Sequence, residues 1–425
     1  MNHSDQACES YQQWSRRSLL RGAATGAAAM LFGPSALAQI SLKQAQVERE
    51  TLVIVFLRGG ADGLNVVTPY GEDEYYKLRP SVALGGPKKG PSGDRVLDLD
   101  GFFGFHPSLA PIEPIFKDGQ MAVVHAIGSG DGSRSHFEAM SAMERGLHYS
   151  GEGASRTNGW LARYLNATQS DQDSPIRALA LTGVLPDSLI GATGAQNISQ
   201  IKDYELRGSE EFRHHIQRVY AKGEDPMTRS GRETMRLLKS LERLDYSGYQ
   251  AQGKTNYPDT GLGQGLRQVA FLQKAEVGLE VAFLDHGGYD THVVQGAGTG
   301  WLANLLSDLA QSLRAFSDDM GPRMNRTTVI VMTEFGRRVY ENGGLGTDHG
   351  RASCMFAMGG GVQGGKVYGN WPGLKKENLE GPGDLRVTTD YRNVLAEALQ
   401  KRLGLASLSP VFPGFAEEPL GIFSS

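Results

Sequence analysis

Nearly continuous apolar runs that end in acidic or histidine-bearing turns are the feature that most constrains this chain of 425 residues. Residues 52–57, 279–284 and 328–332 are runs of this kind, and each leads into such a turn. Apolar runs of this length are typical of strands that are covered on both faces of a parallel sheet. Because an open parallel sheet binds ligands at the carboxyl ends of its strands, we expect carboxylates and imidazoles to gather there, where they could hold a cation.

Strand-like runs alternate with helical patterns along the rest of the chain. Three further strands are predicted, at 121–126, 178–181 and 354–358. A helix is predicted at 301–320, where apolar residues recur on one face and Gly321 follows. A second helix is predicted at 390–403, with Thr389 as its cap and Gly404 as its stop. This alternation predicts an α/β fold with a largely parallel sheet.

Two segments interrupt the alternation. Residues 70–105 contain many Gly, Pro and Lys residues and are predicted to be an irregular insertion. Residues 197–275 are polar and mostly helical, for example at 210–222 and 232–244. Because a strand and a site motif follow directly, we interpret 197–275 as a helical insertion within a single domain of residues 51–425, not as an independent domain.

The N-terminus has the three-part pattern of a twin-arginine signal peptide. The twin arginine is Arg16 and Arg17, and a mild apolar run follows at 23–32. Ala36 and Ala38, on either side of Leu37, have the small-x-small pattern of a cleavage site. The apolar run is too short, and too rich in Ala and Gly, for a membrane anchor. We therefore expect a signal peptide at 1–38, a linker at 39–50, and a periplasmic or secreted bacterial protein with no membrane span.

Composition and short motifs exclude several classes of function. The net charge of −4 and the lack of a basic stripe argue against nucleic-acid binding. Cys8 lies in the predicted signal peptide, so Cys354 remains alone and the mature monomer is expected to have no disulfide. Residues 360–366 match the glycine–lysine pattern of a P-loop but lack the Ser or Thr that must follow, so nucleotide binding is rejected.

Acidic and imidazole side chains in the strand-end turns are the candidate metal ligands. They are Asp62, Asp290, His292, Glu334 and His349. Oxygen and nitrogen ligands without a thiolate are compatible with calcium, magnesium, manganese or zinc. One divalent metal ion of unknown identity is therefore the expected cofactor.

The turn after residues 279–284 holds two acids and two histidines within eight positions. Asp290 and His292 would lie on one side of an extended segment and could share a metal ion. Asp285 and His286, just before them, could supply the ligands instead. A hydrogen-bonded Asp–His pair in a loop is the simpler explanation, but a cluster of this density favours a site.

The other three candidates also have simpler explanations. Asp62 could bind the backbone amides of its own turn. Glu334 ends an apolar run, and a buried carboxylate needs a cation or an arginine such as Arg337 or Arg338. His349 could be a ligand, a proton donor or a solvated loop residue.

Ser135 and Glu138 form an S-x-x-E capping box at the start of a helix that is predicted to run to Arg145. The frequency of such caps favours a capping role for Ser135. The position also follows the strand at 121–126, and a helix N-terminus favours anions. A hydroxyl that attacks a phosphate or sulfate ester would lie here, with Arg134 to hold an oxyanion.

Five motifs together resemble a known family. FLRGGADGLN, SRSHFEAM, GGYDTH, TEFGR and TDHGRAS resemble, in this order, the twin-arginine-exported bacterial family called domain of unknown function 1501. The match covers essentially the whole mature chain. The family is similar to the alkaline-phosphatase and sulfatase superfamily, which implies a three-layer α/β fold with a mostly parallel central sheet and helices on both faces. It also implies a metal site at the strand ends and a nucleophile at a helix N-terminus.

Carried over by motif order, the resemblance assigns roles to single residues. The metal ligands it implies are Asp62, Asp290, His292, Glu334 and His349. The catalytic residues it implies are Ser135 as nucleophile, Arg134 and His136. Phe335 stands where the superfamily has a paired metal histidine, so a site with one metal ion, or a decayed site, fits better than a full two-zinc site.

The resemblance implies an exported metal-dependent hydrolase that acts on phosphate or sulfate esters, with a small-molecule or glycan ester as substrate. The alternative is a non-catalytic periplasmic or secreted protein that keeps the fold for binding or assembly. The loss of one metal histidine at Phe335 favours this alternative. An oxidoreductase is disfavoured because cysteine clusters and a dinucleotide fingerprint are missing.

Overall fold

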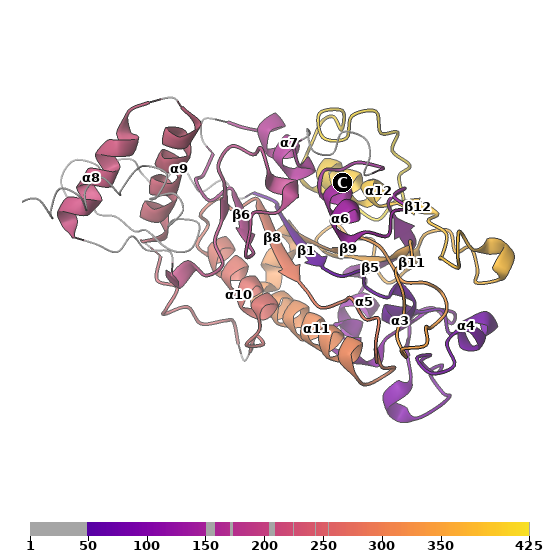
Figure 1. The fold of residues 1–425 in the computed structure, drawn as a ribbon. Helices are drawn as coiled ribbons and strands as arrows, with labels where there is room; N and C mark the ends of the chain where they lie inside the picture. The colour runs from indigo at the N-terminus through magenta and orange to yellow at the C-terminus, as the bar shows by residue number, and fades with distance from the viewer. Residues whose placement is uncertain are drawn as a thin grey trace, which may run out of the picture. The chain divides into compact units, whose positions relative to one another are not determined.

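The computed structural model describes residues 49–149, 158–170, 173–203, 209–223, 225–242, 244–253 and 255–424. The predicted signal peptide at 1–38, and all of the predicted linker except its last two residues, lie outside the described residues. Within the part that is described, no helix combines the length and the apolar character needed to cross a lipid bilayer. Gln200–Tyr249 group into one compact unit, and the remaining described residues group into a larger one. The larger unit contains the sheet and is described first (Figure 1).

A mixed sheet of nine strands, most of them parallel to their neighbours, forms the centre of the larger unit (Figure 1). The strands are β1 (Thr51–Leu57), β5 (Met121–Gly128), β6 (Ala178–Leu181), β7 (Ala195–Asn197), β8 (Val281–His286), β9 (Thr327–Thr333), β10 (Ser353–Gly359), β11 (Val367–Tyr368) and β12 (Thr389–Asp390). Their order is β11-β5-β10-β9-β1-β8-β6-β7, with β12 also paired to β5. Among the strands in the described part of the chain, only β10 runs antiparallel to its neighbours in this sheet, β5 and β9.

All six predicted strands are present. Every residue of β1, β5 and β9 is buried, as continuous apolar runs between two helical layers require. The prediction for β8 was displaced by two residues, so Asp285 and His286 belong to the strand and not to the turn after it. The short strands β7, β11 and β12 were not predicted, because pairs or triplets of residues carry no periodic signal.

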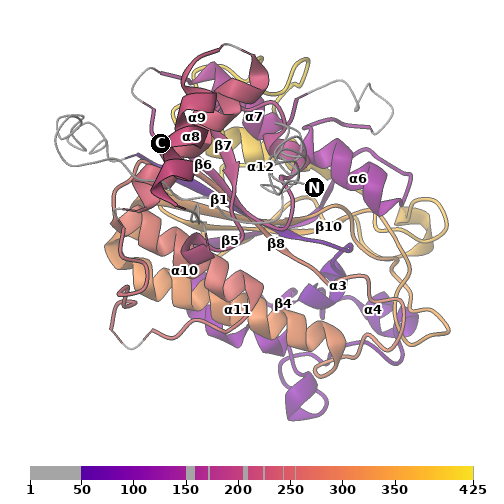
Figure 2. The same cartoon turned by 60° about the vertical axis from the view of Figure 1, so that its left-hand side comes forward.

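Helices cover both faces of the sheet, which confirms the predicted α/β architecture (Figure 2). On one face lie α10 (Gly261–Lys274) and α11 (Trp301–Met320), whose apolar stripe is buried from Leu302 to Phe316. The other face is covered by α6 (His136–Glu144), α7 (Trp160–Ala167) and α12 (Tyr391–Glu397). The bounds predicted for α11 are confirmed.

The helix predicted at 390–403 differs from the structure in two ways. Asp390, not Thr389, is the cap, and its side chain accepts a hydrogen bond from the backbone N–H of Arg392. After α12 the chain continues as a turn of π-helix, η9 (Ala398–Arg402), and Gly404 follows at a positive φ of 67°. An aspartate is as good a cap as a threonine, so the sequence alone did not distinguish them.

The predicted irregular insertion at 70–105 contains short elements. These are α4 (Asp73–Leu78), η2 (Ser92–Asp94), β3 (Leu97–Asp98) and β4 (Gly104–Phe105). The strand β4 pairs with β3 and with β2 (Val67–Thr68) in a separate small sheet. Between β1 and β5 the larger unit also contains α3 (Gly63–Val66), η3 (Pro107–Ile112) and α5 (Glu113–Lys117).

The smaller unit, Gln200–Tyr249, contains η6 (Ile201–Asp203), α8 (Glu210–Ala221) and α9 (Pro226–Leu241). Ser209 and Asp225 cap α8 and α9 through their side chains. The last helix of the predicted insertion, α10, groups instead with the sheet. The division of the whole chain into signal peptide, linker and one domain stays a prediction.

Candidate metal centre

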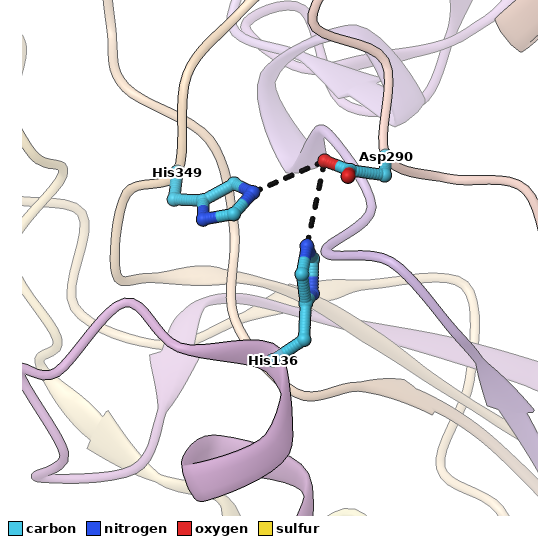
Figure 3. A group of neighbouring side chains, drawn as sticks. All are labelled: His136, Asp290 and His349. Carbon is cyan, nitrogen blue, oxygen red and sulfur yellow. Dashed lines mark hydrogen bonds and ion pairs between the residues drawn. The ribbon is translucent and has the colours of Figure 1, made fainter.

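Three polar side chains from distant parts of the chain meet at the carboxyl edge of the sheet (Figure 3). His136 is the first residue of α6, Asp290 lies in the turn after β8, and His349 lies in the loop between β9 and β10. One nitrogen of each imidazole and one carboxylate oxygen all lie within 4.8 Å of one another. This is the arrangement expected of ligands around a single ion.

The Oδ1 atom of Asp290 is the centre of the group. It lies 3.4 Å from Nε2 of His136 and 3.1 Å from Nε2 of His349. Nε2 of His292 also lies 3.1 Å from this oxygen and 2.9 Å from Nε2 of His349. The ligand atoms of His136, Asp290 and His349 thus lie together, and the imidazole of His292 adjoins two of these residues. We call these four residues the histidine cluster.

A hydrogen-bond acceptor faces the other ring nitrogen, Nδ1, of each imidazole in the histidine cluster. The pairs are His136 with Oε1 of Glu334 at 2.7 Å, His292 with Oδ1 of Asp348 at 3.0 Å, and His349 with the backbone oxygen of Arg134 at 2.8 Å. A carbonyl or a carboxylate can only accept, so each Nδ1 carries the hydrogen. In a neutral ring, each Nε2 then presents a lone pair to the cluster.

A cation would relieve the close approach of these lone pairs. Nε2 of His292 and Nε2 of His349 are only 2.9 Å apart, and two lone pairs at that distance repel each other unless a proton or a metal ion lies between them. Nε2 of His136 is buried and makes no hydrogen bond within the described residues. The donor set therefore fits a divalent ion that accepts imidazole nitrogen.

The charges around the histidine cluster are unequal. Burial alone would raise the pKa of the Asp290 carboxyl, but the guanidinium of Arg337, which donates a hydrogen bond to it, outweighs burial and holds this pKa well below its usual range. The hydrogen bond to Glu334 raises the pKa of His136, whereas burial lowers the pKa of His349. Asp290 therefore stays anionic, and His349 stays neutral more readily than an ordinary imidazole.

Glu334 was predicted to be a metal ligand, but the structure places it behind His136 of the histidine cluster. Its buried carboxylate accepts hydrogen bonds from the backbone N–H of Gly59 at 2.8 Å and from Nδ1 of His136. The hydroxyl of Thr333 lies 3.0 Å from its other oxygen. The simpler explanation, an ion pair with Arg337, is also wrong, because that arginine pairs with Asp290.

Asp62 lies outside the histidine cluster. Both of its carboxylate oxygens are bound by Arg79, at 2.5 and 2.9 Å, and Gln295 donates a further hydrogen bond to Oδ2. Asp62 and Arg79 are both fully buried. Because a buried ion pair is costly to break, the structure gives Asp62 a structural partner in place of a metal ion.

The alternative ligands Asp285 and His286 are also directed elsewhere. Asp285 accepts a hydrogen bond of 2.7 Å from Arg58. His286 lies between the hydroxyl of Tyr289, at 2.9 Å from Nδ1, and the carboxylate of Asp308, at 3.1 Å from Nε2. Asp290 and His292 are thus the members of this turn that reach the cluster.

Ser135 is the N-cap residue of α6, but its side chain makes no capping hydrogen bond, so the predicted capping box is not formed. Its half-buried hydroxyl immediately precedes His136 in the chain. The guanidinium of Arg134 is bound to the buried carboxylate of Asp384. The nucleophile role of Ser135, the oxyanion role of Arg134 and the catalytic role of His136 stay predictions, although the structure groups His136 with the candidate metal ligands.

Phe335 packs against the cluster. Its buried ring lies 4.9 Å from the ring of His136 and 5.0 Å from that of His349, measured between centroids. The φ of Gly60 is +68°, and a Cβ atom there would meet the Phe335 ring at 2.5 Å. An aromatic side chain thus fills the space where a further imidazole would reach the cluster, which favours a centre for one ion.

Arg337 holds the loops of the site together and was not predicted to do so. This buried side chain donates to the backbone oxygens of Gly60, Thr347, Gly59 and Tyr289, at 2.5 to 3.0 Å. It also donates to Oδ1 of Asp290 at 2.6 Å. Arg337 is the last residue of the TEFGR motif, but a sequence gives no signal for a side chain that binds backbone carbonyls of three separate loops.

Replacement by asparagine is predicted to affect mainly protein stability at Asp62 and mainly zinc binding at Asp290. Asp62→Asn leaves the charge of Arg79 buried and unpaired, so we expect it to lower the free energy of unfolding by about 3 kcal/mol and to leave zinc affinity unchanged. Asp290→Asn should weaken zinc binding at least about tenfold at a smaller cost in stability. Urea denaturation and zinc titration of both variants test this, and weaker zinc binding in Asp62→Asn would contradict it.

Arg337→Lys is predicted to lower the free energy of unfolding by about 2–4 kcal/mol, because an ammonium group cannot satisfy the carbonyl oxygens of three loops at once. Arg338→Lys is the matched control. Arg338 is half-buried and its nearest carboxylate, that of Asp348, is 3.8 Å away, so the loss should stay under about 0.5 kcal/mol. If urea denaturation gives similar losses in the free energy of unfolding for the two variants, the proposal that Arg337 holds the loops together is wrong.

Comparisons with solved structures give distant likenesses. The zinc complex of the C-terminal periplasmic domain of EcEptC from Escherichia coli is 8% identical with a TM-score of 0.36, and 73% of each chain is covered. The sulfatase PsFucS1 from Pseudoalteromonas sp. is 12% identical with a TM-score of 0.36, over 88% of this chain and 74% of that one. A mutant of the alkaline phosphatase PafA is 12% identical with a TM-score of 0.24, over 68% and 64%. At these scores the likenesses say nothing of what this chain binds or catalyses.

No curated protein matches the chain. One family model does match, over residues 49–410, and its description is a protein of unknown function, DUF1501. The matched residues include the whole central sheet and all four members of the histidine cluster. The chain therefore belongs to the DUF1501 family.

Proposed function

We propose that this protein is a metal-dependent hydrolase of phosphate or sulfate esters that is exported to the periplasm or secreted. The observation that carries the proposal is the histidine cluster, whose member His136 begins α6 and directly follows Ser135 in the chain. A metal centre next to an uncommitted hydroxyl at a helix N-terminus is suited to an anionic ester. The substrate would be a small-molecule or glycan ester.

The ligand set narrows the identity of the metal ion. Three imidazole nitrogens and one carboxylate oxygen suit zinc, or another transition-metal ion such as manganese, far better than calcium or magnesium, which prefer oxygen ligands. His136, His292, His349 and Asp290 would hold the ion. A bound ion of this kind would polarise an ester oxygen as a Lewis acid.

The residues behind the ligands fix the protons of the site. Glu334, Asp348 and the backbone oxygen of Arg134 each hold a hydrogen on Nδ1, so that all three Nε2 atoms remain available as ligands. Asp290 keeps its negative charge because Arg337 donates to it. The chain itself thus presets both the tautomers and the charge that metal binding needs.

Ser135 would supply the nucleophile. Its oxygen would form a bond to the phosphorus or sulfur atom, the bond to the leaving alcohol would break, and the hydroxyl proton would pass to the departing oxygen. Water would then release phosphate or sulfate and restore the serine. The free backbone N–H groups at the start of α6 would favour the negative charge of the transferred group.

The first test of the proposal is hydrolysis of p-nitrophenyl phosphate and p-nitrophenyl sulfate by the zinc-loaded mature protein. Ser135→Ala should lower kcat by about a thousandfold or more and leave zinc affinity unchanged, because the nucleophile is lost and the ligands are not. Ser133→Ala is the matched control and should retain activity. Full activity of Ser135→Ala would reject the nucleophile, and tight zinc binding without any hydrolysis would favour the non-catalytic alternative.

Zinc affinity is predicted to depend on pH through His136. Glu334 raises the pKa of this imidazole, so protons compete with zinc from a higher pH than at an ordinary histidine, and affinity should fall as pH falls through that raised value. Glu334→Gln should shift the fall to lower pH and weaken affinity at pH 8 by about tenfold or more.

Asp308→Asn is the control for this pH dependence, because Asp308 pairs with His286, an imidazole outside the cluster. Zinc titrations between pH 5.5 and 8 compare the three proteins. An unchanged pH profile in Glu334→Gln, or a profile shifted equally in Asp308→Asn, would show that Glu334 does not set the protonation of His136.

A further inference from the structure

Large apolar side chains are exposed in the chain segments that carry the histidine cluster. Their exposed fractions are 84% for Phe137, 67% for Val293, 64% for Val294 and 50% for Leu345. Phe137 directly follows His136, and Val293 and Val294 directly follow His292. Single exposed apolar residues are ordinary on protein surfaces, but four of them in the segments bearing a polar centre are not. We call these four residues the apolar rim.

Hydrogen bonds hold most of the apolar rim in place. The backbone N–H of Val294 donates to the oxygen of Gly344 at 2.8 Å, and the N–H of Gln295 donates to the oxygen of Leu345 at 2.9 Å. Asn342 donates from its side chain to the backbone oxygen of His292 at 3.0 Å. The two segments are therefore tied together beside a member of the histidine cluster, and the rim on them is preorganised.

The backbone of the apolar rim is strained. The φ angles of Val294 and Leu345 are +48° and +58°, in the left-handed region that side chains with a Cβ atom avoid. A β-branched valine is especially unfavourable there. Strain of this kind at a functional site points to a requirement for the conformation, and here the conformation exposes both side chains to solvent.

We propose that the apolar rim binds the hydrocarbon part of an amphiphilic substrate, an anionic ester that carries a long alkyl or acyl chain. The proposal rests on the proposed function, because the anionic head would lie at the histidine cluster. A single occupant that satisfies both features must present a charged ester and a large apolar group on the same molecule. A substrate without the apolar part would leave the strained, exposed rim unused.

Binding of dodecyl phosphate and ethyl phosphate to the zinc-loaded mature protein tests the proposal without any turnover. Both ligands share the anionic head, so calorimetry below the critical micelle concentration isolates the contribution of the alkyl chain to the binding affinity. We expect dodecyl phosphate to bind roughly 30-fold more tightly or better, with a negative heat-capacity change, because several methylene groups leave water. Equal affinities would overturn the proposal.

A triple variant assigns the effect to the rim. Phe137→Ser, Val293→Thr and Val294→Thr together should remove most of the preference for dodecyl phosphate and leave ethyl phosphate and zinc affinities within about twofold. Val184→Thr is the matched control, since Val184 is 75% exposed in the loop after β6 and is not part of the rim. An undiminished preference in the triple variant, or an equal loss in the control, would reject the assignment.

Binding of dodecyl maltoside, which has the same alkyl chain but an uncharged head group, tests whether the anionic head contributes to affinity. Binding as tight as that of dodecyl phosphate would mean a general apolar surface and would overturn the proposal of an anionic amphiphile. The two proposals also fail separately. Hydrolysis of p-nitrophenyl phosphate without a preference for dodecyl phosphate would reject the rim alone. A clear preference without hydrolysis of any ester would retain the amphiphile and reject the hydrolase.

Discussion

One buried arginine holds the site of this protein in shape. Arg337 uses its rigid fork of N–H groups to bind backbone oxygens in the loops after β1, β8 and β9, and it pairs with Asp290 at the same time. The fork satisfies carbonyl groups that burial would otherwise leave unpaired, and its charge keeps Asp290 anionic. The positions of Asp290, His292 and His349, in the loops after β8 and β9, thus depend on a single residue that lies outside the histidine cluster.

Buried acids around the histidine cluster have divided roles. Asp62 neutralises Arg79, Asp384 binds Arg134, and Glu334 holds the hydrogen of His136. None of them is among the atoms that converge at the centre. Each of these three carboxylates has an arginine or histidine partner, which leaves the half-exposed Asp290 as the carboxylate of the histidine cluster.

The sequence was sufficient for the architecture and for the edge of the sheet where the site lies. Apolar runs and helical periodicity located six strands and α11, because burial on two faces or one face leaves a regular pattern. The partners of each charged side chain were not predictable, since Glu334 and Asp62 carry the same strand-end signal as Asp290. Which carboxylate meets an arginine, an imidazole or an ion depends on loop geometry, and no spacing rule encodes it.

The antiparallel strand β10 has a consequence for how the site assembles. Because β10 runs back beside β9, the segment from Glu334 to His349 leaves the sheet and returns to it at the same edge. Contacts within this segment, such as that of Arg337 with Thr347, therefore close only short loops. The pairing of β1 with β8 instead joins distant residues such as Leu52 and Val281, and beside it the hydroxyl of Thr51 donates to the backbone oxygen of Leu279, 228 positions away. Closure of so long a loop is slow, and the pairing of β5 with β10, which brings His136 towards His349, closes a loop of similar length, so the centre should be completed late in folding. Metal capture would then report that the last long-range contact has formed.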